Sequence, residues 1–334
     1  MDHLIIHPEV REALTEDQPI VLLETAVTTS GLPRKPWCWP DLESVEECTN
    51  NWQASEPVNL ELARAMSATV RAHGAVPATC AISNGKWHVG LDAAHLEELA
   101  LDTKAEKASV TSAARAIRTK VHAGTTVSST LAAGNLVKRV LGKGPLVMAT
   151  GGIGGVHYGW ATLPDISADL RVMARSPIAV VSAGVKSIVD VPATREWLES
   201  LGIPILGLGT EVFPCFIAGL ETDSASIHEV RDEREAAETA RVHWSTIDDH
   251  GGILLAVPLD ERSVLPRDLV DDSTQAAEKA ATDAGVVGPE RTPFLLSHMA
   301  EATNGRSLVA NIQLLINNAR VASRMACCLQ EPSS

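Results

Sequence analysis

Short apolar runs alternate along the chain with longer segments in which apolar residues recur every three or four positions. The short runs are typical of buried strands and lie at 19–25, 77–83, 145–150, 178–184, 204–209 and 252–257. The longer segments have the periodicity of amphipathic helices and lie at 59–73, 126–140, 191–201, 224–242 and 307–328. Strands that alternate with helices predict an α/β fold in which helices cover a sheet.

One pair of strands is expected to run antiparallel. The stretch "SNGKWHVGL" follows the second strand, and its Asn84-Gly85 pair suits a type I′ hairpin turn, which needs positive φ at both positions. The hairpin therefore predicts a mixed sheet. No internal repeat or low-complexity linker divides the chain, so residues 1–334 are expected to form a single domain.

Two segments interrupt the alternation. Residues 33–57 are rich in proline and contain Trp37, Trp39 and Trp52. A connection this long is usually functional or disordered, and the tryptophans argue against disorder. Residues 259–273 are polar, and we expect them to cross the surface.

Charge and composition exclude several classes of protein. Lys and Arg number 28 against 42 Asp and Glu, which gives a net charge of −14, and no basic block occurs, so nucleic-acid binding is disfavoured. No apolar run approaches the ~18 residues of a membrane span, and the N-terminus lacks a signal peptide, so we expect a cytoplasmic protein with no membrane partner. No CxxC pair occurs, which argues against structural zinc and disulfides, among the cysteines Cys38, Cys48, Cys80, Cys215, Cys327 and Cys328.

The glycine-rich stretch "TGGIGGVHYGWATLPDISADL" follows a predicted strand. A dinucleotide fingerprint needs a third glycine where His157 stands, and a helix directly after it, so a Rossmann site is disfavoured. Two interpretations remain open: a nest of backbone N–H groups that holds an anion, or a tight turn between packed layers.

Asp165 and Asp169 lie four positions apart, so on one helix their carboxylates would share a face. One of them could bind a hard divalent ion through oxygen. The alternative is a pair of exposed acids that stabilise the start of a helix.

Two further residues end predicted strands. Lys186 follows "IAVVSAG" and Glu24 ends "VLLE", so both are expected at the sheet edge where α/β proteins bind ligands. Lys186 could act as a nucleophile and Glu24 as a general acid. A structural ion pair is the alternative for either residue alone.

A set of motifs identifies a family. The chain resembles the pseudouridine-5′-phosphate glycosidases, also called the indigoidine synthase A-like family, in segments that occur in family order over residues 22–319. These segments are "LETAVTTSGLP", "HGAVPATCAISNGKWHVGL", "KAS", "AGTTVSSTL", "ATGGIGGVHYG", "DISADL", "VVSAGVKSIVD", "TPFLL" and "SLVANIQLLINNA". The resemblance implies a single-domain α/β/α sandwich with a mixed central sheet, a homotrimer, and reversible cleavage of a C–C bond to ribose 5-phosphate helped by manganese.

The resemblance also implies roles for individual residues. Lys186 is expected to form a Schiff base with C1 of the ring-opened ribose, Glu24 to donate a proton, and Asp165 to bind the metal. Asp169 is expected to act as a base and Lys107 as an active-site lysine. Residues expected to contact substrate are Thr125, Thr126, Val127, His157, Ser167, Ala168 and Asn311. The glycine stretch, with Thr125 and Thr126, is expected to hold the phosphate.

The sequence departs from the family where polar groups are expected. Ser30 replaces a histidine, Val110-Thr111-Ser112 replace a charged triplet, and Val257 replaces an asparagine. Buried polar contacts select small polar bases strongly, and tryptophan favours stacking on a flat ring.

These departures favour a C-glycosynthase that joins ribose 5-phosphate to an aromatic, polyketide-type aglycone bound partly by residues 33–57, in secondary metabolism. The alnumycin C-ribosylating enzyme is the precedent. The alternatives are cleavage of pseudouridine 5′-phosphate to uracil and ribose 5-phosphate, and a non-catalytic sugar-phosphate-binding protein.

Overall fold

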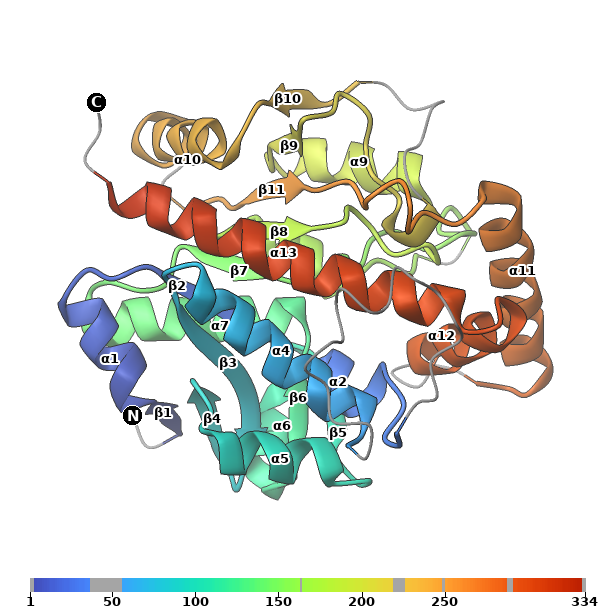
Figure 1. The fold of residues 1–334 in the computed structure, drawn as a ribbon, viewed down its shortest axis with the longest axis horizontal. Coiled ribbons are helices and arrows are strands. Elements are labelled where there is room, and N and C mark those ends of the chain that lie inside the picture. The colour runs from blue at the N-terminus through green and yellow to red at the C-terminus, as the bar shows by residue number, and fades with distance from the viewer. Residues whose placement is uncertain are drawn as a thin grey trace.

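The protein is built on one mixed central sheet (Figure 1). The computed structural model describes residues 3–36, 56–162, 164–218, 226–247, 250–286 and 291–331. The strands run in the order β1-β4-β3-β2-β7-β8-β11-β9-β10, and β6 joins β5 to β3. Their bounds are β1 Leu4–Ile6, β2 Ile20–Leu23, β3 Val76–Ser83, β4 Lys86–Val89, β5 Glu106–Ala108, β6 Ala123–Thr125, β7 Val147–Ala149, β8 Ala179–Ser182, β9 Ile205–Leu208, β10 His228–Val230 and β11 Ile253–Ala256.

The sheet is mixed, as the hairpin predicted. Strands β2, β7, β8, β11 and β9 pair in parallel, so their carboxyl ends meet at one edge. β3 pairs antiparallel with β4, with Ser83 opposite Lys86. The turn residues Asn84 and Gly85 have φ of 50° and 75°, which confirms the positive values expected of a type I′ turn.

Helices cover both faces of the sheet, which confirms the predicted α/β/α layering. In Figure 1, α13 and α4 cross one face and α7 lies behind the sheet. The helices are α1 Pro8–Thr15, α2 Ala26–Ser30, α4 Val58–Ala72, α5 Ala93–Leu101, α6 Ala113–Thr119, α7 Val127–Leu141, α8 Ala168–Met173, α9 Val191–Ser200, α10 Glu233–Val242, α11 Arg267–Asp283, α12 Arg291–Ala302 and α13 Arg306–Gln330, with a 3₁₀ turn at Phe216–Ala218 and a π-helical turn at His243–Ile247. At α7, Thr126 and Ser129 form a reciprocal capping box that fixes where the helix begins.

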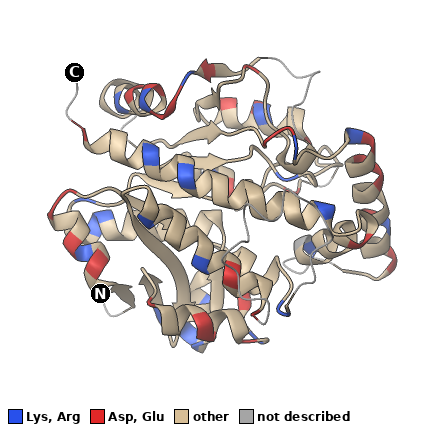
Figure 2. Ribbon diagram, viewed as in Figure 1, with Lys and Arg blue, Asp and Glu red and all other residues tan. Residues whose placement is uncertain are grey.

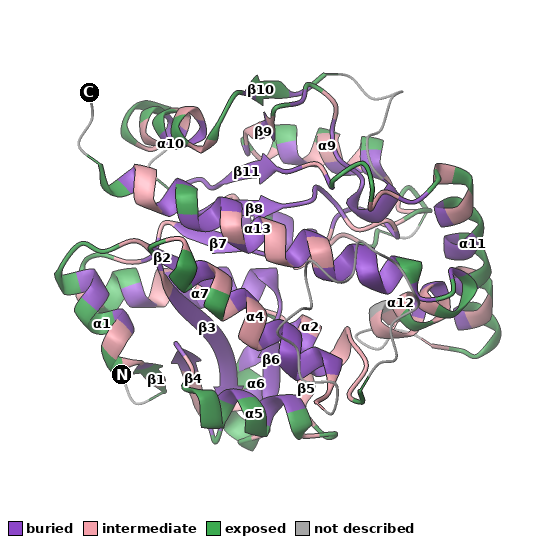
Figure 3. Ribbon diagram, viewed as in Figure 1, coloured by how far each residue is buried: buried purple, intermediate pink, exposed green. Residues whose placement is uncertain are grey.

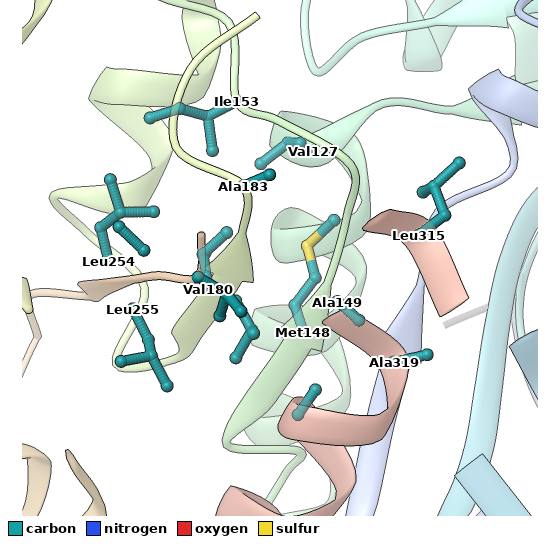
Figure 4. Close-up of a cluster of buried hydrophobic side chains, with 14 of the residues drawn as sticks. Val127, Met148, Ala149, Ile153, Val180, Ala183, Leu254, Leu255, Leu315 and Ala319 are labelled. Atoms are coloured by element: carbon teal, nitrogen blue, oxygen red, sulfur yellow. The ribbon is translucent and has the colours of Figure 1, made fainter. Parts of the chain in front are cut away.

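The core lies between these layers. The central strands are buried along their length, whereas α1 and α10 expose their outer faces (Figure 3). Figure 4 shows apolar side chains from β7, β8, β11 and α13 packed together, among them Met148, Val180, Leu254 and Ala319. A parallel sheet covered on both faces requires such uninterrupted apolar strands, which explains why its strands were predictable.

Two sequence expectations are wrong. The segment 224–242 is not one helix: β10 takes His228–Val230, and α10 begins at Glu233 with Asp232 as its N-cap. The segment 259–273, expected to interrupt the alternation of strands and helices, contains the start of α11 at Arg267. In both cases the residues around the boundary are largely polar, so the hydrophobic pattern does not show where one element ends and the next begins. Trp37, Trp39 and Trp52 lie outside the described residues.

Charged residues are scattered over the outer helices, while the central strands carry almost none (Figure 2). No helix in the described parts of the chain is long and apolar enough to cross a membrane. In the described parts of the chain, no disulfide joins Cys80, Cys215, Cys327 or Cys328. The remaining two cysteines, Cys38 and Cys48, lie outside the described residues.

Candidate active site

A cavity of about 460 Å³ opens at the carboxyl ends of the parallel strands. Glu24 follows β2, the glycine stretch follows β7, and Lys186 follows β8, so the topology alone brings three distant segments to one edge. Lys107 enters from β5 on the adjoining part of the sheet. The sequence-predicted residues that line the cavity are Glu24, Lys107, Thr126, His157, Asp165, Ser167, Ala168, Asp169, Lys186 and Asn311.

Glu24 is a buried acid with one polar partner. Its side chain is 7% exposed, and Oε1 accepts a hydrogen bond from the Thr150 hydroxyl. Burial raises the pKa of Glu24 above its usual value, against the opposing pull of Lys186 and the Thr150 hydrogen bond. An acid whose pKa is raised in this way retains its proton nearer to neutral pH, which is the property a general acid needs.

Lys186 and Lys107 face the same cavity. Gly184 turns the chain after β8 with φ of 76°, and a Cβ at this position would lie 1.9 Å from the carbonyl oxygen of Pro214. Only glycine fits there, and the turn delivers Lys186 to the cavity. Burial and the nearby charge of Lys186 lower the pKa of Lys107 to about 8, so the two ammonium groups interact electrostatically.

Asp169 completes the charged cluster and is held rigidly. Its carboxylate accepts hydrogen bonds from the backbone N–H of Ser128 at 2.9 Å and of Gly154 at 3.0 Å. Ser128 lies in the first turn of α7, where the helix dipole favours a negative charge. Asp169 therefore joins the start of α7 to the glycine stretch and places a fixed negative charge near both lysines.

Close packing explains why two positions of the glycine stretch are glycine. A Cβ at Gly154 would lie 2.4 Å from Ser167 Oγ, and one at Gly155 would lie 2.3 Å from Thr194 Oγ1. The N–H groups of Ile153, Gly154 and Val156 are donated to Gly184, Asp169 and Thr194. These three N–H groups are engaged within the protein, as a turn between packed layers requires. Gly151 and Gly152 line the cavity, so the expectation that this stretch holds phosphate stays a prediction.

Asp165 and Asp169 do not share a helix face. The helix α8 begins only at Ala168, with Ser167 as its N-cap, so Asp165 lies before it. Asp165 is exposed and lines the cavity mouth, whereas Asp169 is buried. No group of three or more His, Cys, Asp or Glu side chains that could hold a metal occurs in the described ranges. Asp165 alone offers a hard oxygen ligand, and waters would have to complete the coordination of a divalent ion.

Thr125 and Val127 lie outside the cavity. The Thr125 hydroxyl is fully buried and donates to the carbonyl of Cys80 at 2.8 Å, so it supports the sheet. Val127 packs against the apolar cluster beside Ile153 and Ala183 (Figure 4). Any contact of Val127 with substrate would have to use its backbone. Thr126 does line the cavity, with its hydroxyl 3.0 Å from that of Ser128.

The positions that depart from the family divide into two groups. Ser30, Thr111 and Ser112 line the cavity and so alter the surface that meets the ligand. Val110 packs against the core, and Val257 is 3% exposed and buried within it. The position at which Val257 replaces the asparagine of the family therefore lies outside the cavity wall.

A second cavity of about 500 Å³ adjoins the first. The two share six lining residues, namely Ser30, Gly31, Phe216, Pro293, Leu296 and Asn311. Pro33 and Lys35, the described start of the 33–57 segment, also line the second cavity. Sequence reasoning missed Phe216 because nothing in its local pattern distinguishes it from a core residue.

Comparisons with known proteins agree with this architecture. The family model described as "Indigoidine synthase A like protein" matches residues 42–328. The chain is 39% identical to the pseudouridine-5′-phosphate glycosidase of Caldanaerobacter subterraneus subsp. tengcongensis, with 95% of this chain and 94% of the relative covered. It is 40% identical to that of Sorangium cellulosum, with 99% and 95% covered.

Solved structures give the same result. The crystal structure of the prealnumycin C-glycosynthase AlnA in complex with ribulose 5-phosphate superposes with a TM-score of 0.81 at 29% identity, covering 99% of this chain and 98% of that one. An indigoidine synthase A-like protein from Thermotoga maritima gives 0.80 at 29% identity, covering 98% and 97%. The chain belongs to the indigoidine synthase A-like family, whose relatives include pseudouridine-5′-phosphate glycosidases.

Proposed function

We propose that this protein breaks the C–C glycosidic bond of pseudouridine 5′-phosphate to give uracil and ribose 5-phosphate. The observation that carries the proposal is the meeting of Glu24, Lys107, Asp169 and Lys186 around one cavity. Relatives that are 39% and 40% identical bear the glycosidase name, and they support cleavage better than the aromatic C-ribosylation that the sequence departures favoured.

The chemistry assigns complementary roles to Lys186 and Glu24. Nζ of Lys186, as the neutral amine, attacks C1 of the ribose, and the C1–O bond of the ring breaks. The nitrogen gives up one proton, which Asp169 passes to the released oxygen so that it becomes a hydroxyl. The nitrogen lone pair then forms a protonated imine as the C–C bond breaks, and the bonding electrons pass to the uracil carbon. Glu24 protonates this carbon, and water later hydrolyses the imine to release ribose 5-phosphate. A C-glycoside has no leaving oxygen that an acid could protonate. Covalent catalysis by an amine solves this problem, because the nitrogen lone pair helps to break the C–C bond.

The remaining polar residues hold the substrate. Lys107, Thr126 and Ser128 lie together on the cavity wall and supply donors for the phosphate. Asp169 orients the ammonium groups and accepts protons. Asp165 would hold a divalent ion, Mn²⁺, with waters as its other ligands. When bound, such an ion supplies positive charge and ordered water at the cavity mouth.

Borohydride trapping tests the proposal. Wild type and Lys186→Arg are incubated with ribose 5-phosphate, reduced and weighed by mass spectrometry, while release of uracil from pseudouridine 5′-phosphate is followed separately. We expect one covalent adduct and uracil release in wild type, and neither in Lys186→Arg. An equal adduct in the variant rejects Lys186 as the nucleophile. Adduct formation without uracil release rejects pseudouridine 5′-phosphate as the substrate.

A second candidate is C–C bond formation between ribose 5-phosphate and an aromatic carbon. It is favoured by the superposition on a C-glycosynthase over 99% of the chain, and by the small side chains of Ser30, Thr111 and Ser112 on the cavity wall. Bond formation is the reverse of the cleavage step and needs the same lysine and acid. The adduct would then form in the trapping experiment without uracil release.

A further inference from the structure

We propose that Phe216 is a positioning residue for Lys186, and that its ring holds the loop that carries this lysine against the glycine stretch. The proposal rests on the proposed function, which makes Lys186 the group that attacks the sugar. It gives a function to an apolar side chain of the cavity wall that takes no part in the chemistry itself.

The loop that carries Lys186 is bound by its backbone to the glycine stretch. The N–H of Ala183 donates to the carbonyl of Gly151 at 2.9 Å. Ile153 donates to the carbonyl of Gly184 at 3.1 Å and accepts from the N–H of Lys186 at 3.1 Å. These bonds continue the pairing of β7 with β8 beyond the ends of both strands. A shift of the glycine stretch would therefore move the backbone of Lys186.

Phe216 packs on the same two segments. Its N–H donates to the carbonyl of Ala183 at 2.9 Å, which attaches the turn at 216–218 to the loop of Lys186. A Cβ at Gly152 would lie 3.0 Å from Cδ2 of the ring, and a Cβ at Gly151 would lie 3.4 Å from Cε2. The Cβ position at Gly152 is also 3.3 Å from the backbone nitrogen of Lys186. One edge of the ring thus fills the space that two absent side chains leave beside the lysine.

The backbone of Phe216 indicates more than ordinary core packing. Its φ is 55°, in the left-handed region that bulky residues rarely adopt. Such a conformation persists only where the surrounding structure imposes it, and it is typical of functional sites. The side chain is 3% exposed and lines both cavities, so the strained residue belongs to the wall of the site.

A fixed Lys186 has a consequence for Lys107. Burial is the first cause that lowers the pKa of Lys107 to about 8, and the charge of Lys186 is the second, while Asp169 and Glu24 act in the opposite direction. A loosely held Lys186 would repel Lys107 less, so the pKa of Lys107 should rise toward its usual value of 10.5. The placement of Lys186 can therefore be measured through Lys107 without any substrate.

Replacing the ring tests the assignment. Phe216→Leu keeps an apolar side chain but removes the flat ring from the glycines, and Phe216→Met is a second replacement if the first fails to fold. Phe213→Leu is the matched control. Phe213 is fully buried, lies on the same segment, and is not among the described residues that line either cavity.

Two quantities are measured for each variant. Borohydride quenching at successive times after addition of ribose 5-phosphate gives the rate at which the adduct forms on Lys186. Competitive acetylation across pH, followed by peptide mass spectrometry, gives the pKa of Lys107. We expect the Phe216 variants to form the adduct about tenfold more slowly, because small displacements of reacting groups cost large factors in rate. Their Lys107 profile should move up by about 0.5 pH unit or more, and neither quantity should change in Phe213→Leu.

A double variant tests whether the ring acts through the glycine. Gly152→Ala places a methyl group against the ring and should also slow adduct formation. If both substitutions disturb one contact, Gly152→Ala combined with Phe216→Leu should be within about twofold of Gly152→Ala alone. Effects that multiply would overturn this contact as the means by which Phe216 holds Lys186.

Unchanged adduct formation and an unchanged Lys107 profile in the Phe216 variants overturn the positioning role and leave the proposed function intact. Equal changes in Phe216→Leu and Phe213→Leu also overturn it, because they would reflect a loosened core. If wild type forms no adduct, the proposed function fails and the Lys107 profile decides. A shift confined to the Phe216 variants then supports the positioning role, and no shift overturns it.

Discussion

At the scale of single residues, burial creates the reactivity of this site. Glu24 and Lys107 would be an ordinary acid and an ordinary base in water, and the cavity moves their pKa values toward each other. Desolvation is the largest cause in both cases. It disfavours the charged form of each group, so acid and amine approach the neutral pH range from opposite sides.

The raised pKa of Glu24 predicts a pH-dependent stability. The folded protein binds this proton more tightly than the unfolded chain, so stability falls as pH rises from the ordinary value of 4.5 through the raised folded value. Glu24→Gln should remove this decline and melt higher than wild type at pH 7, by about 2 °C for each kcal/mol gained. Melting curves from pH 4.5 upward check this, with exposed Glu12→Gln as the control. Parallel curves for wild type and Glu24→Gln would contradict it.

The lowered pKa of Lys107 predicts a change in substrate affinity. The side chain is an ammonium ion below about pH 8 and a neutral amine above it. If this charge holds the phosphate, KM for pseudouridine 5′-phosphate should rise above pH 8 in wild type. Lys107→Met should have a KM about tenfold higher that no longer changes across this range. Lys104→Met, at an exposed position nearby, should behave as wild type. A wild-type KM that stays flat to pH 10 would remove Lys107 from phosphate binding.

At the scale of elements, α13 supports the acid through the end of β7. Asn318 on α13 donates to the carbonyl of Thr150 at 2.8 Å, and the Thr150 hydroxyl donates to Glu24. Glu24, which directly follows β2, is thus positioned by the end of β7 and, through it, by α13. Asn318 is not among the described residues that line the first cavity, so it acts on Glu24 through Thr150.

Thr150→Val tests this positioning. Loss of the hydroxyl removes a hydrogen bond that lowers the pKa of Glu24, so the pKa should rise further. The alkaline limb of the kcat profile should move to higher pH, and kcat should fall about tenfold, because a hydrogen bond to a charged group is worth ~1.5–3 kcal/mol. Thr150→Ser keeps the hydroxyl and should keep the wild-type profile. A pure loss of rate at all pH values in Thr150→Val, with no shift, would indicate only a structural role.

Sequence patterns predicted elements according to how completely each is buried. The strands β2, β3, β7, β8, β9 and β11 carry apolar runs and were all expected. The strands β1, β5, β6 and β10 have three residues each, too few to establish a period, whereas β7, also of three residues, lies within the longer apolar run at 145–150. β10 has two exposed residues of three, so it merged with the helix that follows.

The candidate site was predictable where a residue directly follows a strand. The positions of Glu24 and Lys186 at the site could be predicted from one rule, that the carboxyl ends of parallel strands meet at one edge of the sheet. The burial of Thr125 and Val127 was not predictable, because a matching motif does not reveal which way a side chain points. Phe216 could not be found either, since its role depends on a backbone angle and on contacts with the distant Gly152.

At the scale of the whole molecule, one sheet contains strands from both ends of the described chain. It includes the first strand, β1, and the last helix, α13, packs on it. The N-terminal strand β1 pairs with β4, and α13 packs on β2, β7 and β8. Because these contacts join segments that are far apart in the described sequence, a single domain remains the expectation.

We predict one cooperative unfolding transition and a trimeric assembly. The interleaved sheet argues for a single transition by calorimetry, with no separately melting half. The trimer is expected from the family resemblance, and light scattering should give three times the chain mass of 35.4 kDa. Two resolved transitions would reject the single domain. A mass of one or two chains would reject the trimer.

The origin of the two cavity walls has a consequence for how such proteins diversify. The charged cluster comes from positions 24 to 186, whereas most of the second cavity's wall comes from positions 293 to 308, together with the loop at 32–33. Substitutions on α12 and the start of α13 therefore fall mainly on the second cavity, although Pro293 and Leu296 also line the first. Exchanging residues 291–308 between family members is accordingly expected to change the second cavity while it keeps all four charged residues Glu24, Lys107, Asp169 and Lys186.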